Sequence, residues 1–112
     1  MNDENKLRAL LGIAKKAGKA ILGTDMTVEA IRSGKKKSVK LILVAADASQ
    51  TTVKRITNTG SFYKVPIIVT AFDKSELAHS VGSEAELSVV GISDEGFAKA
   101  IIKTRENENG EF

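Results

Sequence analysis

The chain has 112 residues, of which 42% are hydrophobic, a proportion that suits one domain with one modest core. It contains no cysteine, which excludes disulfides, thiolate metal sites and a cysteine nucleophile, and which fits a reducing compartment. The net charge of +3 is mild but unevenly distributed, because residues 15–40 hold eight basic and two acidic side chains whereas residues 73–112 hold four basic and nine acidic ones.

The N-terminal third of the chain alternates helical and extended patterns. It predicts a helix over 3–16, a short strand over 19–22 and a second helix over 25–33. The first helix is amphipathic, since apolar residues recur at the i, i+3, i+4, i+7 spacing of one face, namely Leu7, Leu10, Leu11 and Ala14. Thr24 or Asp25 can accept hydrogen bonds from the first free N–H groups of the second helix.

The remaining residues predict three more strands and three more helices. The run VKLILVAA over 39–46 is rich in β-branched residues and too short for most helices, so we predict a central strand that is buried on both faces. Further strands follow over 65–70 and 87–92, and the position of Pro66 indicates a strand entry or a sheet edge for the first of these. The expected caps of the three helices are Ser49, Asp73 or Ser75, and Ser93 or Asp94. The helix capped by Ser49 should end near Gly60.

This alternation predicts an α/β sandwich with a central sheet of about four strands and helices on both faces. We assign residues 1–105 to a single domain and residues 106–112 to a flexible polar C-terminal tail. No apolar run approaches 18 residues, and the first ten residues are polar and of mixed charge. We therefore expect neither a membrane span nor a signal peptide, and a cytoplasmic location.

The stretch over 15–32 places a lysine-rich segment, a short strand, Gly23 and a helix start in succession. A helix N-terminus carries partial positive charge and free donors, which suit a phosphate or the edge of a base. Three lysines, Lys35, Lys36 and Lys37, come directly after this helix. Such a charge distribution can steer RNA or DNA onto one face, because phosphate neutralisation supplies most non-specific affinity. The alternatives are a solvated basic loop and, less favoured without large aromatic side chains, a membrane surface.

Catalytic constellations are scarce in this sequence. His79 is the only histidine, and no serine or cysteine signature accompanies it. The acidic pairs Glu84–Glu86 and Asp94–Glu95 do not match the spacing of a calcium loop, and no Walker-type phosphate loop is present. We predict no catalytic residue, no metal, no cofactor and no small-molecule substrate.

Several segments, taken in order, carry a resemblance to a known family. They are AKKAGKAILG, TVEAIRSGKKKSVKLILVAADAS, TGSFYKVPIIV and DEGFAKAI. In this order they resemble the kink-turn-binding ribosomal-protein superfamily, the L-seven-Ae and L-thirty-e group, and in particular its bacterial branch of small YlxQ-like proteins. The resemblance runs from about residue 10 to residue 102. It implies a three-layer α/β/α sandwich that grips sharply bent RNA at a kink-turn.

The resemblance also implies contact residues. In that family the glycine at the turn into the second helix, and the residues just after it, meet the tandem sheared G·A pairs of the kink. The matching positions here are Gly23, Thr24, Asp25, Met26 and Glu29. Strong RNA binders usually have Asn or Lys at the position of Asp25, Glu or Gln at that of Met26, and Lys at that of Glu29. A carboxylate can accept from a base amino group, but it cannot neutralise a phosphate.

The second contact surface of the family is an apolar loop before the last strand, which packs on a flipped-out nucleotide. It matches residues 82–87 here, which carry Glu84 and Glu86 where relatives are apolar or basic. Basic residues flank the binding edge and are predicted phosphate contacts: Lys15, Lys16, Lys19, Arg32, Lys35, Lys36 and Lys37.

The sequence thus predicts a non-enzymatic RNA-binding protein that forms a ribonucleoprotein with structured RNA of the translation machinery. One alternative is a protein-interaction module of the ribosome that has kept the fold but binds RNA weakly. Another is an accessory module that recruits RNA for an RNA-modifying enzyme such as a methyltransferase. Fold alone does not choose among these functions.

Overall fold

The computed structural model describes residues 3–34 and 39–108. In these residues five helices and four strands follow one another along the chain. The elements are α1 (Asp3–Lys16), β1 (Ala20–Leu22), α2 (Thr24–Ser33), β2 (Leu41–Val44), α3 (Gln50–Tyr63), β3 (Ile67–Val69), α4 (Lys74–Ser80), β4 (Val89–Ile92) and α5 (Glu95–Glu108). The predicted order of helices and strands is confirmed.

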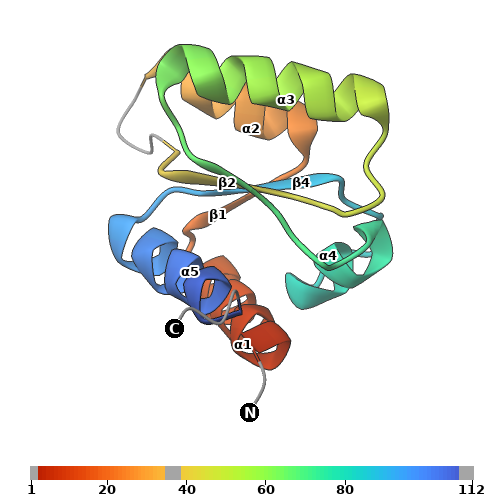
Figure 1. Ribbon diagram of the computed structural model, residues 1–112, viewed down its shortest axis with the longest axis vertical. Helices are drawn as coiled ribbons and strands as arrows, with labels where there is room; N and C mark the ends of the chain where they lie inside the picture. The colour runs from red at the N-terminus through yellow and green to blue at the C-terminus, as the bar shows by residue number, and fades with distance from the viewer. Residues whose placement is uncertain (1–2, 35–38, 109–112) are drawn as a thin grey trace.

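The four strands form one mixed sheet in the order β1-β4-β2-β3. Strand β4 pairs antiparallel with both of its neighbours, while β2 and β3 pair in parallel. Helices α2 and α3 cover one face of the sheet, and α1, α4 and α5 cover the other (Figure 1). The chain therefore folds as the predicted three-layer α/β/α sandwich.

Strand β2 supplies side chains to both hydrophobic cores. Leu41 and Leu43 lie in the core beneath α1 and α5, whereas Ile42 and Val44 lie in the core beneath α2 and α3. Successive side chains of a strand point to opposite faces of the sheet, so a central strand between two helical layers must be apolar throughout. All four residues are buried, as the sequence predicted.

Three of the predicted helix caps are present. Ser49 caps α3, its Oγ accepting from the Thr52 N–H at 3.1 Å. Asp73 forms a reciprocal capping box with Glu76 at the start of α4. The Asp94 Oδ2 accepts from the Phe97 N–H at 2.9 Å at the start of α5. These side chains satisfy backbone donors that no helix can satisfy internally.

The predicted end of the third helix at Gly60 is wrong. Helix α3 continues to Tyr63 and ends at Lys64, which has the left-handed φ of 60°. A Cβ at Gly60 would lie 2.7 Å from the Ile67 Cδ1 and 3.0 Å from the Val65 carbonyl oxygen. Glycine is therefore needed there for the close approach of the helix to the strand that follows it, and not as a helix stop.

The position of β3 agrees with the prediction, whereas the end of α5 does not. Strand β3 is an edge strand, as Pro66 predicted. Helix α5 runs to Glu108, so residues 106–108 of the predicted tail are helical, and residues 109–112 lie outside the described part of the chain. No helix in the described ranges is long and apolar enough to cross a membrane.

Candidate nucleic-acid interface

The turn from β1 into α2 is built on Gly23. Its φ of 100° and ψ of 156° lie in a region that is essentially restricted to glycine. Its N–H donates to the Val89 carbonyl at 2.9 Å, and its carbonyl accepts from the Thr27 N–H at 3.1 Å. Gly23 thus ends the pairing of β1 with β4 and begins α2 within one residue.

Helix α2 begins without a side-chain cap. The prediction that Thr24 or Asp25 would cap it is wrong, because Gly23 is the N-cap residue and no side chain makes a capping hydrogen bond. The helix starts one residue earlier than expected, which places Thr24 and Asp25 inside its first turn. The partial positive charge and the donors of this helix N-terminus are therefore not satisfied by a cap.

The predicted contact residues of α2 lie on its outer face. Thr27, Val28 and Ile31 are buried against the sheet, whereas Asp25, Met26 and Glu29 are exposed. Met26 is 62% exposed, which is high for a large apolar side chain. This face presents two carboxylates and one apolar side chain to a partner.

Asp25 pairs with an arginine that the sequence interpretation left out of the site. The Arg55 Nη1 donates to the Asp25 Oδ1 at 2.6 Å, and the two side chains are 47% and 88% exposed. Arg55 belongs to α3, which packs beside α2. The pairing spans 30 positions of the chain, so no local pattern in the sequence indicates it.

The predicted second contact loop, residues 82–87, lies at the same edge as Gly23. The loop leads through Ser88 to Val89, whose carbonyl accepts the Gly23 N–H. Within the loop the Ser83 Oγ donates to the Ala85 carbonyl at 2.8 Å, and Glu84 and Glu86 are exposed. We call the Gly23 turn, the first turn of α2 and residues 82–87 the kink edge.

The predicted basic contacts lie elsewhere. Lys19 precedes β1, at the end of the strand opposite to Gly23. Its carbonyl accepts a hydrogen bond from the Ser93 N–H at 2.9 Å. Four residues of extended chain separate Lys19 from Gly23 by about 13 Å. Lys15 and Lys16 form the last turn of α1, at the same end of the sheet as Lys19. Helix α2 runs back toward this end, and Arg32 lies in its last turn. We call Lys15, Lys16, Lys19 and Arg32 the basic end.

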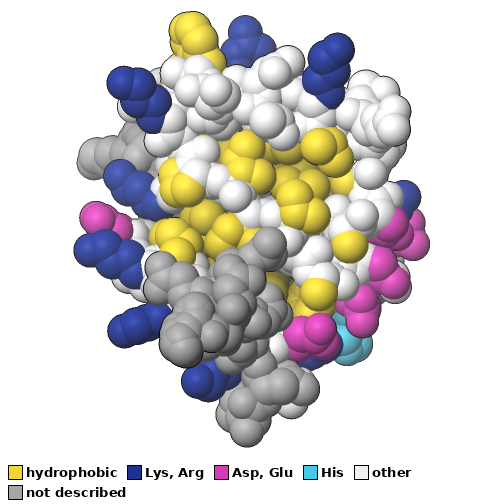
Figure 2. Space-filling model, in the orientation of Figure 1, with side chains coloured by type: hydrophobic (Ala, Val, Ile, Leu, Met, Phe, Trp, Pro, Cys, Tyr) yellow, Lys and Arg dark blue, Asp and Glu magenta, His cyan; other side chains and the backbone are white. Residues whose placement is uncertain are grey.

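The structure therefore divides the predicted site residues into two groups. Gly23, Thr24, Asp25 and Met26 form part of the kink edge, with Glu29 one turn further along α2. The basic end lies opposite, and Lys35, Lys36 and Lys37 lie outside the described residues. Figure 2 shows one face of the molecule, with dark-blue side chains along its left and top and most of the magenta ones along its right, near α4.

The described residues contain no group of three or more histidine, cysteine, aspartate or glutamate side chains that could hold a metal ion. The kink edge offers hydrogen-bond donors, the exposed carboxylates of Asp25, Glu84 and Glu86, and the exposed side chain of Met26, while Arg55 of α3 pairs with Asp25 beside it. These groups suit contacts with base edges and phosphates.

The arrangement defines an α/β/α-sandwich protein with an exposed glycine turn that leads into an uncapped helix. Comparison with known proteins specifies the family: the chain belongs to the ribosomal protein L7Ae/L30e/S12e/Gadd45 family, whose model matches residues 5–102. The resemblance predicted from the sequence is thus confirmed.

Individual relatives agree with this assignment. The chain is 39% identical over 108 residues to the RNA-binding protein YlxQ of Enterococcus faecium, covering 95% of this chain and 96% of the relative. It is 33% identical over 98 residues to the large ribosomal subunit protein eL30 of Sulfolobus acidocaldarius, covering 88% of each. The structure of the 15.5 kDa RNA-binding protein of Giardia lamblia has a TM-score of 0.75 at 15% identity, covering 96% of this chain and 88% of that one, a likeness of fold.

Proposed function

We propose that this chain is a non-enzymatic RNA-binding protein that recognises a kink-turn-like bend in structured RNA. One observation carries the proposal: the Gly23 turn and the loop over 82–87 meet at one edge, joined by the hydrogen bond from the Gly23 N–H to the Val89 carbonyl. The names of the relatives support the class of ligand, since one is an RNA-binding protein and another a ribosomal protein. We further propose that the protein works in the cytoplasm, in ribonucleoproteins of the translation machinery.

The chemistry of the kink edge fits this role. The uncapped N-terminus of α2 offers donors to a phosphate or to acceptors on bases. Asp25 can accept from the amino group of guanine or cytosine, while Arg55 beside it can reach a phosphate with its remaining donors. Met26 provides an apolar surface for a base or a sugar. The basic end then holds the phosphates of an adjoining duplex.

Crosslinking of the protein to RNA in growing cells, followed by sequencing, tests the proposed partner. We expect enrichment of ribosomal RNA or mRNA leaders whose sequences form consecutive G·A pairs next to a bulge. The variant Arg55→Ala should lower the yield of crosslinked RNA without changing the amount of protein. Crosslinks spread evenly over cellular RNA would contradict recognition of a bend.

The exposed acids support a second candidate function, a protein-interaction or accessory module of the ribosome or of an RNA-modifying enzyme. Glu84 and Glu86 are exposed in the loop that leads to Val89, and Glu29 lies on the outer face of α2. Each would repel a nearby phosphate. Such an edge would bind RNA weakly and could contact a basic protein surface instead. Protein crosslinks at Glu29 or at the loop over 82–87 that survive ribonuclease treatment would favour this second function.

A further inference from the structure

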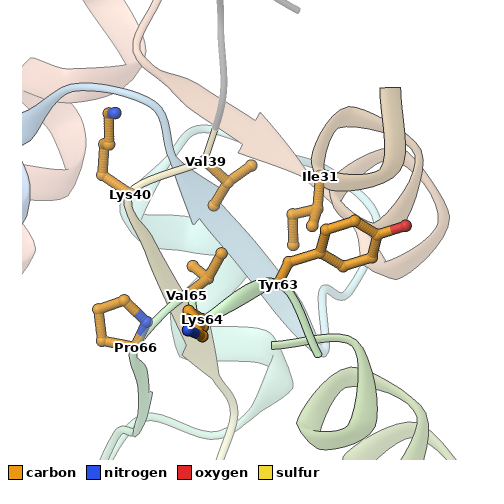
Figure 3. A pocket seen from close by; sticks show the side chains of 7 residues that line it. All are labelled: Ile31, Val39, Lys40, Tyr63, Lys64, Val65 and Pro66. Atoms are coloured by element: carbon orange, nitrogen blue, oxygen red, sulfur yellow. The ribbon is translucent and has the colours of Figure 1, made fainter. Parts of the chain in front are cut away.

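A cavity of about 400 Å³ opens between the carboxyl-terminal ends of α2 and α3 and the starts of β2 and β3. Its floor is apolar and is formed by Ile31, Val39 and Val65, whose side chains point toward one another in Figure 3. The ten residues of α2 separate this cavity from the kink edge by about 15 Å. The cavity is therefore a separate site from the one described above.

One exposed aromatic ring lines this cavity, and a second packs against it. Tyr63 lines it and is 41% exposed, and its neighbour Phe62 is 78% exposed. Their rings meet edge to face, with centroids 4.9 Å apart and planes at 75°. Exposed rings of this kind are platforms on which unpaired bases stack, and the stacking tolerates any base because each has a π-face.

Cationic side chains flank the same opening. Lys40 and Lys64 line the cavity, both are exposed, and no acidic side chain is among the described residues that line it. Arg32 lies in the last turn of α2, which ends beside the cavity. These charges suit the phosphates of a strand whose base occupies the apolar floor.

The backbone of Lys64 provides an independent observation. Lys64 is the non-glycine residue with a positive φ in the described part of the chain, and it occupies the left-handed position that ends α3. Glycine is the residue that usually fills this position, since other side chains are strained there. Lysine occupies this position here, and Lys64 lines the cavity.

We propose that this cavity binds an unpaired nucleotide of an RNA strand, with the base against Tyr63 and the apolar floor and the phosphate between Lys40 and Lys64. The inference rests on the proposed function, to which it adds a second contact beyond the kink edge. The carboxyl-terminal ends of two helices carry partial negative charge, so the site suits a base with amino donors more than a bare phosphate.

Nuclear magnetic resonance of the labelled full-length chain tests this site directly. We expect a single-stranded hexanucleotide to shift the backbone amide resonances of Ile31, Tyr63 and Val65. Adenosine monophosphate should shift the same resonances at higher concentration, because it lacks the neighbouring phosphates, and inorganic phosphate should leave them unchanged. Equal affinity for the mononucleotide and the hexanucleotide would overturn the assignment to a strand. So would shifts confined to the kink edge.

Two variants make the test specific. Lys64→Gly relieves the strained backbone while removing the cation, so it should fold at least as stably as the wild type yet bind the hexanucleotide more weakly. Tyr63→Ala should weaken binding about fivefold or more, the usual loss when one stacking ring is removed. Lys6→Ala removes an exposed lysine of α1 and should behave as the wild type. Wild-type binding of the hexanucleotide by both cavity variants would refute the proposal.

Different measurements test kink recognition and the cavity site, so either one can be wrong while the other stands. A blunt kink-turn RNA without a single-stranded extension should bind Tyr63→Ala and Lys64→Gly as tightly as the wild type, because neither residue lies at the kink edge. If the blunt RNA fails to bind while the hexanucleotide still shifts Tyr63, kink recognition is wrong and the cavity site stands. If the blunt RNA binds and the hexanucleotide shifts nothing in the cavity, the cavity site is wrong.

Discussion

Arg55 of α3 holds Asp25 of α2 through a 2.6 Å contact between its Nη1 and the Asp25 Oδ1. The contact places a positive charge beside the carboxylate that family resemblance directs at the RNA. The negative charge of Asp25 is thus offset within the protein, and the pair presents both an acceptor and several donors to a partner. Opposition to RNA at the kink edge therefore depends more on Glu29, Glu84 and Glu86 than on Asp25.

Replacing Arg55 by alanine should weaken RNA binding by about 1.5 kcal/mol, since it removes a charged donor and leaves Asp25 uncompensated. The variant Asp25→Asn removes that uncompensated charge, so Arg55→Ala should cost less in the Asp25→Asn background. The pair is exposed, and the free energy of unfolding should change by less than about 1 kcal/mol in each variant. Fluorescence anisotropy with a labelled kink-turn RNA, together with urea unfolding, measures both quantities. Additive effects of the two substitutions on affinity would show that RNA does not sense the pair.

Reversing the charge at Glu29 should strengthen RNA binding. Glu29 is exposed one turn after the start of α2, so Glu29→Lys replaces a repulsion with an attraction worth about 1 to 2 kcal/mol at a solvated interface. Glu4→Lys makes the same change of net charge on α1, which lies on the opposite face of the sheet from α2 (Figure 1), and serves as the control. Both affinities are compared at one salt concentration. An equal gain from the two substitutions would indicate net charge alone and would remove Glu29 from the interface.

The basic end should contribute affinity without contributing recognition of the bend. Changing Lys15, Lys16 and Lys19 together to alanine should weaken binding to bent and straight RNA alike. It should also flatten the dependence of log affinity on log salt, by about 0.7 to 0.9 of a slope unit for each phosphate that the protein no longer neutralises. The same triple change at Lys35, Lys36 and Lys37 should have an effect of the same kind. A salt slope equal to that of the wild type would show that the lysines tested are merely solvated.

Gly23 should be required for stability as well as for RNA binding. A Cβ there meets no atom within 4 Å, so any loss on Gly23→Ala comes from the backbone conformation at φ 100° and not from a steric clash. Conformations of this kind cost a side-chain-bearing residue about 1 to 3 kcal/mol. Gly12→Ala is the control, because Gly12 lies inside α1 and an added Cβ meets its nearest neighbour at an ordinary 3.6 Å. Thermal unfolding should show Gly23→Ala less stable than the wild type and Gly12→Ala at least as stable.

Local patterns were sufficient to predict most of the fold. The apolar run of β2, the proline before β3 and the caps Ser49 and Asp73 each have a physical effect within a few residues, and each prediction is confirmed. One of the exceptions, the predicted end of α3 at Gly60, has a tertiary cause. That glycine lies inside α3 because of the close contact with Ile67, and no local pattern distinguishes such a glycine from a helix stop.

The candidate site was less predictable, because its geometry depends on which segments meet. The residues after Gly23 could be named from the resemblance alone. Their neighbours could not, since the pairing of Asp25 with Arg55 joins two helices and the bond from Gly23 to Val89 joins two strand ends. The lysines near Gly23 in the sequence lie at the opposite end of β1, because an extended strand carries neighbouring residues apart quickly.

Recognition of a kink is tested by measuring the affinity of the wild-type protein for a kink-turn RNA and for a straight duplex of equal length, at one fixed salt concentration. A second kink-turn RNA, whose consecutive G·A pairs are replaced by Watson–Crick pairs, controls for sequence. We predict binding to the kink-turn at least tenfold tighter than to either of the other two RNAs, because only the bent RNA presents its base edges to the start of α2. Equal affinity for all three RNAs would contradict recognition of a kink by this edge.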